Sequence, residues 1–365
     1  MEKIRKKDLL LLIGVCAFLA LGGLSLLLFP APRYSATENR MLAEKPKFSL
    51  TSLANGSYTA AWESYTAERI AGRRVMRGAH AALELMLGKG EANGVILCRD
   101  GSLSKRLTVN EHVYRKNLKA IAKYTALANA RGTTLTVAVA PRRMDARAAV
   151  LPRLYRARED PAPYQTLRES LPDALVFDAL TKDADWYRTD HHWTTAGAYK
   201  AYRALGNRLG FIPYEESAFS KETVSEAFWG TSDAACGLLG VAPDTLTLWR
   251  TQDDQEFSLL KDGKPAAFAG LYDLEKRNTR DGYAVFLGGN DGVIEVKRGQ
   301  EDTRPTLLVI KDSFANAVIP FLAHHFHIIA VDPRYTAMDI GTYFEEADQV
   351  LLLWGMQTLS EVGLF

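Results

Sequence analysis

The sequence predicts an α/β protein in which a parallel sheet is flanked by helices. From about residue 93 to the end, short apolar segments alternate with amphipathic helical segments, a pattern typical of parallel strands that are buried on both faces. Polar residues that can do chemistry follow several of these segments directly, where the carboxyl ends of parallel strands meet at one edge of a sheet. With 365 residues, of which 47% are hydrophobic and 24% charged, the chain is long enough for one large domain or two modest ones.

The first predicted element is a transmembrane helix from Leu9 to Phe29. This apolar run is long enough to cross a hydrocarbon core of about 30 Å. A cleaved signal peptide is the alternative, but its apolar region is usually about 7–15 residues long and ends at small residues, whereas this run is longer and leaves through Phe29-Pro-Ala-Pro32. A buried core helix is disfavoured by the basic residues that precede the run, which are Lys3, Arg5, Lys6 and Lys7. By the positive-inside rule this basic end stays in the cytoplasm, so we expect a single-pass membrane protein with an extracytoplasmic body.

Charge and cysteine content exclude several classes of function. The net charge of +2 arises within the first eight residues, so the remainder is neutral and no nucleic-acid partner is expected. Cys16 lies in the predicted span, and the pairing of Cys98 with Cys236 is left open because sequence does not set their separation. The chain has no Cys-x-x-Cys and no zinc-like spacing, and no cofactor is expected.

Three regions follow from the pattern along the chain. Residues 1–30 form the cytoplasmic tip and anchor, 31–92 a helical stalk or N-terminal subdomain, and 93–365 the α/β domain. Within that domain we expect at least five sheet strands, at Thr134–Ala140, Ala174–Phe177, Thr306–Ile310, His327–Val331 and Gln349–Trp354. Helices are expected over about Glu111–Ala130, Tyr164–Ser170 and Thr195–Leu209 and from Phe314 onward, and a hairpin is expected near Gly94–Gly101.

Residues from about 212 to 300 do not follow the alternation of apolar strands and amphipathic helices. Short strands, turn sequences at Asp262-Gly263 and Asn290-Asp-Gly292, and Trp229 and Trp249 among polar residues predict a β-rich insertion. We expect this insertion to lie over the edge of the sheet and to shape a substrate cleft.

Ser313 is the candidate nucleophile. It follows the strand that ends at Ile310 by three residues and opens the Phe314 helix, so its hydroxyl and N–H group are expected at a helix N-terminus, where an oxyanion can be stabilised. Taken alone, the same position is explained more simply by helix capping by Asp312 or Ser313, a common role for both residue types.

The segment Tyr187–Trp193 contains a candidate base and acid. A serine hydroxyl becomes a good nucleophile when an imidazole takes its proton and a carboxylate holds the other ring nitrogen. In an extended segment the side chains of Asp190 and His192 point the same way and form that pair, while His191 points to the opposite side. The alternatives are an exposed polar loop, a structural histidine, or a metal site with a further ligand from His324–His327. We expect no metal, because adjacent histidine side chains diverge.

Two further segments can contribute to the site. Phe286-Leu-Gly-Gly289-Asn290 ends a strand-like run. Glycines allow a substrate to approach the backbone closely, and the Asn290 amide can donate a hydrogen bond, so the segment suits an oxyanion site. A plain turn explains the spacing equally well. Arg334 and Tyr335 follow the strand that ends at Val331, where a guanidinium can hold a carboxylate or an acyl oxygen.

Two of these segments carry a resemblance to a known family. Thr189-Asp-His-His-Trp193 together with Ile310-Lys-Asp-Ser-Phe314 resembles the DHHW proteins of Gram-positive bacteria, which are related to the SGNH-hydrolase-like acetyltransferases of alginate biosynthesis. Further segments fit along nearly the whole chain, at Glu38–Arg40, Phe286–Asn290, Asp332–Tyr335 and Asp348–Trp354.

The resemblance implies an SGNH-hydrolase-like sheet and a division of roles. Asp190 and His192 are implied as acid and base and Ser313 as nucleophile, and His191 and Trp193 are candidates for substrate binding. The implied activity is O-acetyl transfer to, or deacetylation of, a cell-surface polysaccharide, with an unidentified acetyl donor for which a membrane acyl-transfer protein is one candidate. A non-catalytic carbohydrate-binding or envelope-assembly protein and a metal-dependent hydrolase are the competing classes.

Overall fold

The computed structural model describes residues 6–28, 32–35, 38, 40–106, 108–156, 162–336 and 338–363. The chain divides into two compact units, one of residues 1–93 with 237–239 and the other of residues 94–236 with 240–365. Lys3 and Arg5 of the basic flank and residues 29–31 of the predicted exit from the membrane lie outside the described residues.

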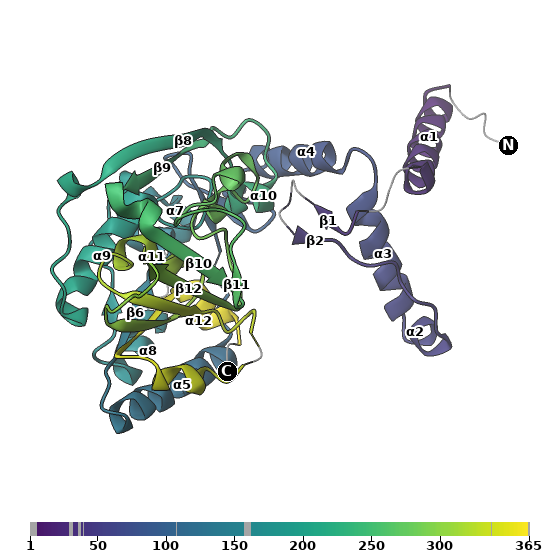
Figure 1. Cartoon of the computed structure of the whole chain (residues 1–365). Helices are drawn as coiled ribbons and strands as arrows, with labels where there is room; N and C mark the ends of the chain where they lie inside the picture. Colours follow the sequence, from purple (N-terminus) through teal and green to yellow (C-terminus); the bar gives the residue numbers. More distant parts are fainter. Residues whose placement is uncertain are drawn as a thin grey trace. The chain divides into compact units, whose positions relative to one another are not determined.

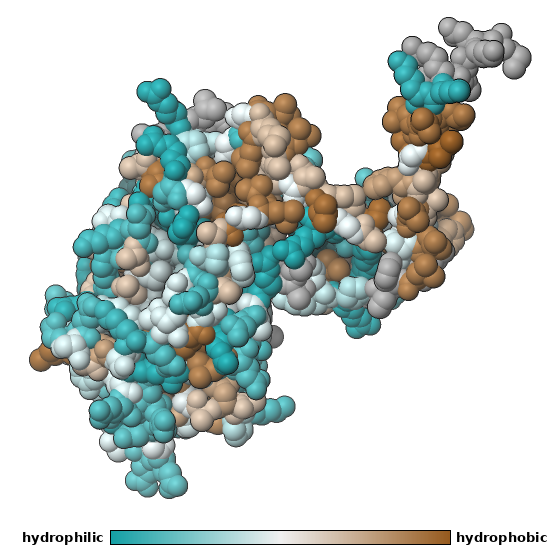
Figure 2. Space-filling view, turned by 90° about the horizontal axis from the view of Figure 1, so that it is seen from above, coloured by the Kyte–Doolittle hydropathy of each residue, from teal (hydrophilic) through white to brown (hydrophobic). Residues whose placement is uncertain are grey.

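The first unit begins with the apolar helix α1, Lys6–Leu28. Its Leu9–Leu26 stretch is the one segment of the described chain that is long and apolar enough to cross a membrane, and most of its side chains are exposed and hydrophobic (Figure 2). This confirms the predicted N-terminal apolar helix. The unit also contains β1 (Tyr34–Ser35), β2 (Arg40–Met41), α2 (Leu50–Ala54), α3 (Ser57–Arg69) and α4 (Arg73–Met86).

Glu38 and Arg40 have a structural role in this unit. The Glu38 carboxylate accepts from Arg73 at 2.6 Å and from Arg40 at 2.9 Å, and Arg40 also contacts Glu68 at 2.6 Å. Burial raises the pKa of Glu38, but the hydrogen bonds from Arg73 and Arg40 outweigh that effect and lower the pKa to about 2. The Glu38-x-Arg40 pair therefore ties the β1–β2 segment to α3 and α4.

The second unit is built on an eight-stranded sheet with the order β11-β10-β12-β14-β13-β15-β6-β7 (Figure 1). Five neighbouring strands are parallel, and they lie where the sequence predicts them: β14 (His327–Val331), β13 (Thr306–Lys311), β15 (Gln349–Gly355), β6 (Leu135–Ala140) and β7 (Leu175–Val176). The predicted α/β class with its mainly parallel sheet is confirmed.

The insertion takes part in this sheet instead of lying over its edge, which corrects the sequence-based expectation. Three of its strands, β12 (Val293–Arg298), β10 (Phe257–Lys261) and β11 (Lys264–Pro265), extend the sheet antiparallel beyond β14. Without them β14 would present unpaired backbone groups as an open edge. Two further insertion strands, β8 (Ser220–Phe228) and β9 (Asp244–Arg250), pair with each other as a separate two-stranded sheet.

Helices cover both faces of the sheet (Figure 1). On one face, α9 (Thr195–Leu209) and α11 (Ile319–Leu322) pack in a core with Leu307 and Val309 of β13. On the other face, α5 (Glu111–Ala130) and α12 (Met356–Glu361) pack in a core with Leu308 and Ile310 of the same strand. Consecutive residues of β13 thus face opposite cores, as expected for a strand buried on both faces.

Candidate active site

Ser313 lies where β13 ends and a short 3₁₀ helix, η7 (Ser313–Ala317), begins. Asp312 is the capping residue, because its carboxylate accepts from the N–H of Phe314 at 2.9 Å and from the N–H of Gly355 at 2.7 Å. Capping by Asp312 leaves the Ser313 hydroxyl available for another role. The helix expected from Phe314 onward is instead this single 3₁₀ segment followed by the short helix α11, Ile319–Leu322, so a helix dipole contributes little here.

The structure brings Ser313, His192 and Asp190 together. His192 Nε2 is 2.8 Å from Ser313 Oγ, and His192 Nδ1 is 2.5 Å from Asp190 Oδ1. The carboxylate can only accept, so Nδ1 carries the proton in the neutral ring and Nε2 is left as the acceptor for the serine O–H. This is the connectivity of nucleophile, base and orienting acid.

Asp190 is buried and fully hydrogen-bonded. Its Oδ1 also accepts from the N–H of His192 at 2.9 Å, and its Oδ2 accepts from the N–H and the hydroxyl of Thr231 at 2.7 and 2.9 Å. Burial raises the pKa of Asp190, but the neighbouring His192 and His191 and these hydrogen bonds outweigh it and hold the pKa far below its ordinary value. A Cβ at position 230 would lie 2.3 Å from Asp190 Oδ2, so Gly230 is needed for this approach.

A carboxylate of the insertion holds the segment that precedes Asp190. Asp244 at the start of β9 accepts from the N–H groups of Arg188 and Thr189, each at 2.8 Å, and from the Thr189 hydroxyl at 2.6 Å. The insertion therefore positions the acid and base, a role that spacing along the chain did not indicate.

His191 does not point away from its neighbours, contrary to the expectation for an extended segment. Its ring centroid is 3.8 Å from that of His192, and its Nδ1 is 2.6 Å from the hydroxyl of Thr231. The segment bends at these residues and forms no strand, so alternation of side chains does not apply. Burial and the neighbouring His192 lower the pKa of His191.

Asp190, His191 and His192 also form a set of donor atoms that a metal ion could use. Their ligand atoms lie within 4.8 Å of one another. However, Asp190 already accepts four hydrogen bonds from His192 and Thr231, and His192 Nε2 is engaged with Ser313. A cation would displace these contacts, so the residues fit a proton relay better than a metal centre.

Aromatic rings fix the imidazole of His192. Tyr283 is stacked on it, with centroids 3.9 Å apart and planes 4° apart, and Phe314 packs against it at 4.9 Å. Trp193 is fully buried and donates its indole N–H to the carbonyl of Phe314 at 3.1 Å. Trp193 therefore supports Phe314, which packs against His192, and its own side chain is not exposed in this structure.

The remaining predicted residues lie at the same edge of the sheet. Gly289 and Asn290 precede β12, and the Asn290 side-chain oxygen accepts from Lys311 at 3.0 Å. Arg334 is held by two contacts to the buried Asp332, at 2.9 and 2.7 Å, so its charge is largely committed to that carboxylate. Tyr335 is exposed.

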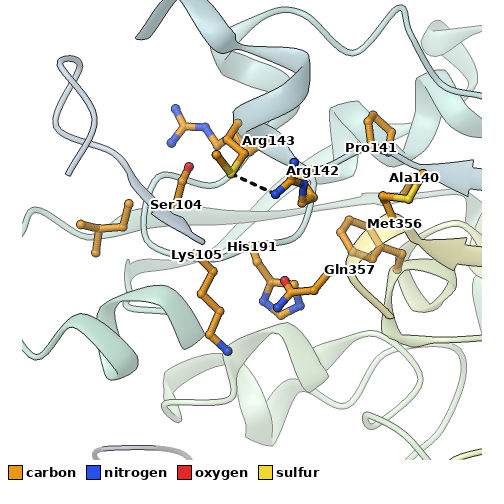
Figure 3. Close-up of a pocket in the computed structure, with 12 residues that line it drawn as sticks. Ser104, Lys105, Ala140, Pro141, Arg142, Arg143, His191, Met356 and Gln357 are labelled. Carbon is orange, nitrogen blue, oxygen red and sulfur yellow. Dashed lines mark hydrogen bonds between the residues drawn. The ribbon is translucent and has the colours of Figure 1, made fainter. Parts of the chain in front are cut away.

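A pocket adjoins the site and contains residues that the motifs did not single out. His191 and Phe314, both in contact with His192, form part of its wall. Figure 3 shows His191 among the residues that line the pocket. The rest of the lining includes Lys105, Arg142, Arg143, Met356 and Gln357. Residues 141–144 directly follow β6, and residues 356–357 directly follow β15. Their position after parallel strands was the available sequence signal.

The fold is α/β, with the polar cluster at the carboxyl edge of a mainly parallel sheet. This is the SGNH-hydrolase-like arrangement that the sequence resemblance implies. Residues 176–332 match the model of the DHHW protein family. This match confirms the resemblance carried by Thr189–Trp193 and Ile310–Phe314.

Two solved structures, those of a DHHW family protein and of PatB1, support the assignment of the fold. A DHHW family protein from Eubacterium siraeum has a TM-score of 0.61 and 21% identity, over 74% of this chain and 93% of that one. Bacillus cereus PatB1 with a sulfonyl adduct has a TM-score of 0.58 and 20% identity, over 74% and 98%. The O-acetyltransferase domain of Pseudomonas putida AlgJ has a TM-score of 0.45 and 19% identity, over 73% and 92%. A search of curated proteins finds no match to the chain.

Proposed function

We propose that the protein is a serine-dependent acyl transferase or esterase that uses Ser313, His192 and Asp190 on acetyl groups of a cell-surface polysaccharide. The observation that carries the proposal is the continuous pair of contacts from Asp190 through His192 to Ser313, at 2.5 and 2.8 Å. The choice of acetyl groups and carbohydrate rests on what the resemblance of Thr189–Trp193 and Ile310–Phe314 to the DHHW proteins and the related acetyltransferases implies.

In the proposed reaction, Ser313 Oγ attacks the carbonyl carbon of an acetyl ester while His192 Nε2 takes the hydroxyl proton. Asp190 keeps the imidazole in the required tautomer and stabilises the imidazolium that forms. When the tetrahedral intermediate collapses, the donor's alcohol leaves with the proton from His192 and the acetyl group stays on Ser313. A sugar hydroxyl or water then attacks that ester, His192 takes its proton, and the serine is regenerated.

The oxyanion of the tetrahedral intermediate requires donors beside Ser313. Among the described residues, the N–H of Ser313 has no hydrogen-bond partner within the protein, which leaves it free to bind an oxyanion. Asn290 is the second donor that we propose, because its amide lies in the network around Lys311 at the same end of β13. Donors of this kind are typically worth about 10²–10³ in kcat each.

A serine-directed probe tests this proposal on the full chain in detergent. A fluorophosphonate should label Ser313 of the wild-type protein, since His192 removes the proton of the attacking hydroxyl. His192→Ala should abolish the labelling, whereas His191→Ala is the matched control and should retain it. Peptide mass spectrometry locates the adduct. Equal labelling of wild type and His192→Ala, or an adduct at another residue, would contradict the proposed roles.

The cellular location is the second part of the proposal. We infer that α1 is an uncleaved anchor with the second unit outside the cytoplasm, because its Leu9–Leu26 stretch is apolar enough to span and follows basic residues. A reporter fused to the C-terminus should be exported and should remain in the membrane fraction. Removing the first 32 residues should leave a folded soluble body, and release of a shortened soluble chain from the intact protein would show that α1 is a cleaved signal.

A further inference from the structure

Lys311 is a fully buried lysine two residues before the candidate nucleophile. Its ammonium donates to Asn316 Oδ1 at 2.8 Å and to Asn290 Oδ1 at 3.0 Å, and it is 3.6 Å from Asp332 Oδ2. Burial lowers the pKa of Lys311 to about 8, although Asp332 opposes that effect. A buried cation costs free energy unless it is paired and hydrogen-bonded. An apolar residue at the end of β13 would not carry this desolvation cost. Lys311 is therefore expected to do more than fill space.

The contacts of Lys311 fix how the amide of Asn290 is turned. An ammonium can only donate, so the side-chain oxygen of each asparagine must face it. Asn316 then directs its NH₂ group to Asn290 Oδ1 at 3.1 Å and to the carbonyl of Gly289 at 3.3 Å. With two donors on its oxygen, Asn290 must direct its own NH₂ group away from Lys311.

The same network ties the loop before Asn290 to the turn that carries Ser313. Asn316 belongs to η7, which begins at Ser313. Leu287, Gly288 and Gly289 all have positive φ, at 58°, 71° and 93°, and a positive φ is unfavourable for a leucine. A loop of this kind keeps one conformation only if its surroundings hold it, and Lys311 and Asn316 supply contacts that do so.

We propose that Lys311 is a positioning residue that orients the Asn290 amide as an oxyanion donor. This inference rests on the proposed function. A role as the ion-pair partner of Asp332 accounts less well for the geometry, because Asp332 already makes two shorter contacts with Arg334.

A double-mutant cycle separates this role from simple stabilisation. On a small acetyl ester, Asn290→Ala should lower kcat by about 10²-fold. Lys311→Met should lower kcat by at least about tenfold with little change in KM, because it acts on the same donor. In the Asn290→Ala background, Lys311→Met should cause little further loss, since its effect is already gone. Independent, multiplicative losses would overturn the inference.

Two controls keep the result interpretable. Lys311→Gln retains an NH₂ group that can donate to Asn290, so it should recover part of the activity lost in Lys311→Met and serves as the second variant if the latter folds poorly. Leu118→Ala removes a buried side chain of α5 from the core on that face of the sheet and should lower Tm without lowering kcat. An equal loss of kcat in Leu118→Ala would assign the effect to destabilisation. Full activity of Ser313→Ala would overturn the proposed function, whereas multiplicative losses together with an inactive Ser313→Ala would overturn only the role of Lys311.

Discussion

Ser313→Ala should leave the protein folded and lower hydrolysis of a small acetyl ester by at least about 10³-fold. The substitution removes the one oxygen that His192 Nε2 contacts at 2.8 Å and leaves the capping contacts of Asp312 with Phe314 and Gly355 in place. Folding is therefore expected to be almost unaffected while the covalent route is lost. Initial rates and a thermal melt of the same preparation measure the two effects.

His192→Ala should cause nearly the same loss, and the double variant should be little worse than either single one, because nucleophile and base act as one unit. His191→Ala is the matched control. It removes a neighbouring imidazole that contacts the Thr231 hydroxyl at 2.6 Å and makes no hydrogen bond with Ser313 among the described residues. If Ser313→Ala kept full activity, or if His191→Ala were the more damaging change, a metal-dependent or binding role would have to replace the serine mechanism.

Much of the fold could be predicted because the parallel strands are buried on both faces. Each reads as a continuous apolar run, as in Thr306–Ile310, and such runs stand out against amphipathic helices. The polar residues that follow these runs were predictable as site residues for the same reason, since the carboxyl ends of parallel strands converge. Ser313 was found in this way, whereas Asp190 and His192 were found from their residue types and spacing within Tyr187–Trp193. The three residues lie within hydrogen-bonding distance of their partners.

The residues that sequence reasoning missed act through contacts between distant parts of the chain. Thr231 holds Asp190 across 41 positions, and Asp244 holds Thr189 across 55. Neither Thr231 nor Asp244 belongs to a local motif. Threonine and aspartate are common at turns, so their presence there does not indicate a site residue. The side-chain direction of His191 was also out of reach, because it depends on the bend at these residues and not on a regular period.

Removing residues 349–365 should abolish cooperative folding. The deletion takes away β15, which lies between β13 and β6 and pairs with both, and its loss would divide the sheet. Val350, Leu351, Leu352, Leu353 and Trp354 are all completely buried. Burial of a large apolar side chain contributes roughly 1.5–3 kcal/mol, so their combined loss is comparable to the whole stability of a typical domain, about 5–15 kcal/mol.

The matched control for this deletion is a chain that ends at Val362. It keeps β15, α12 and the contact of Asn117 with the Val362 carbonyl at 2.8 Å, so its melting transition should stay close to that of the full chain. Thermal unfolding followed by circular dichroism compares the two. A chain ending at Asp348 that melted with an undiminished transition would refute the placement of β15 at the centre of the sheet. Because β15 leads directly into Gly355, whose N–H binds the Asp312 carboxylate at 2.7 Å, the same deletion should also remove the labelling of Ser313.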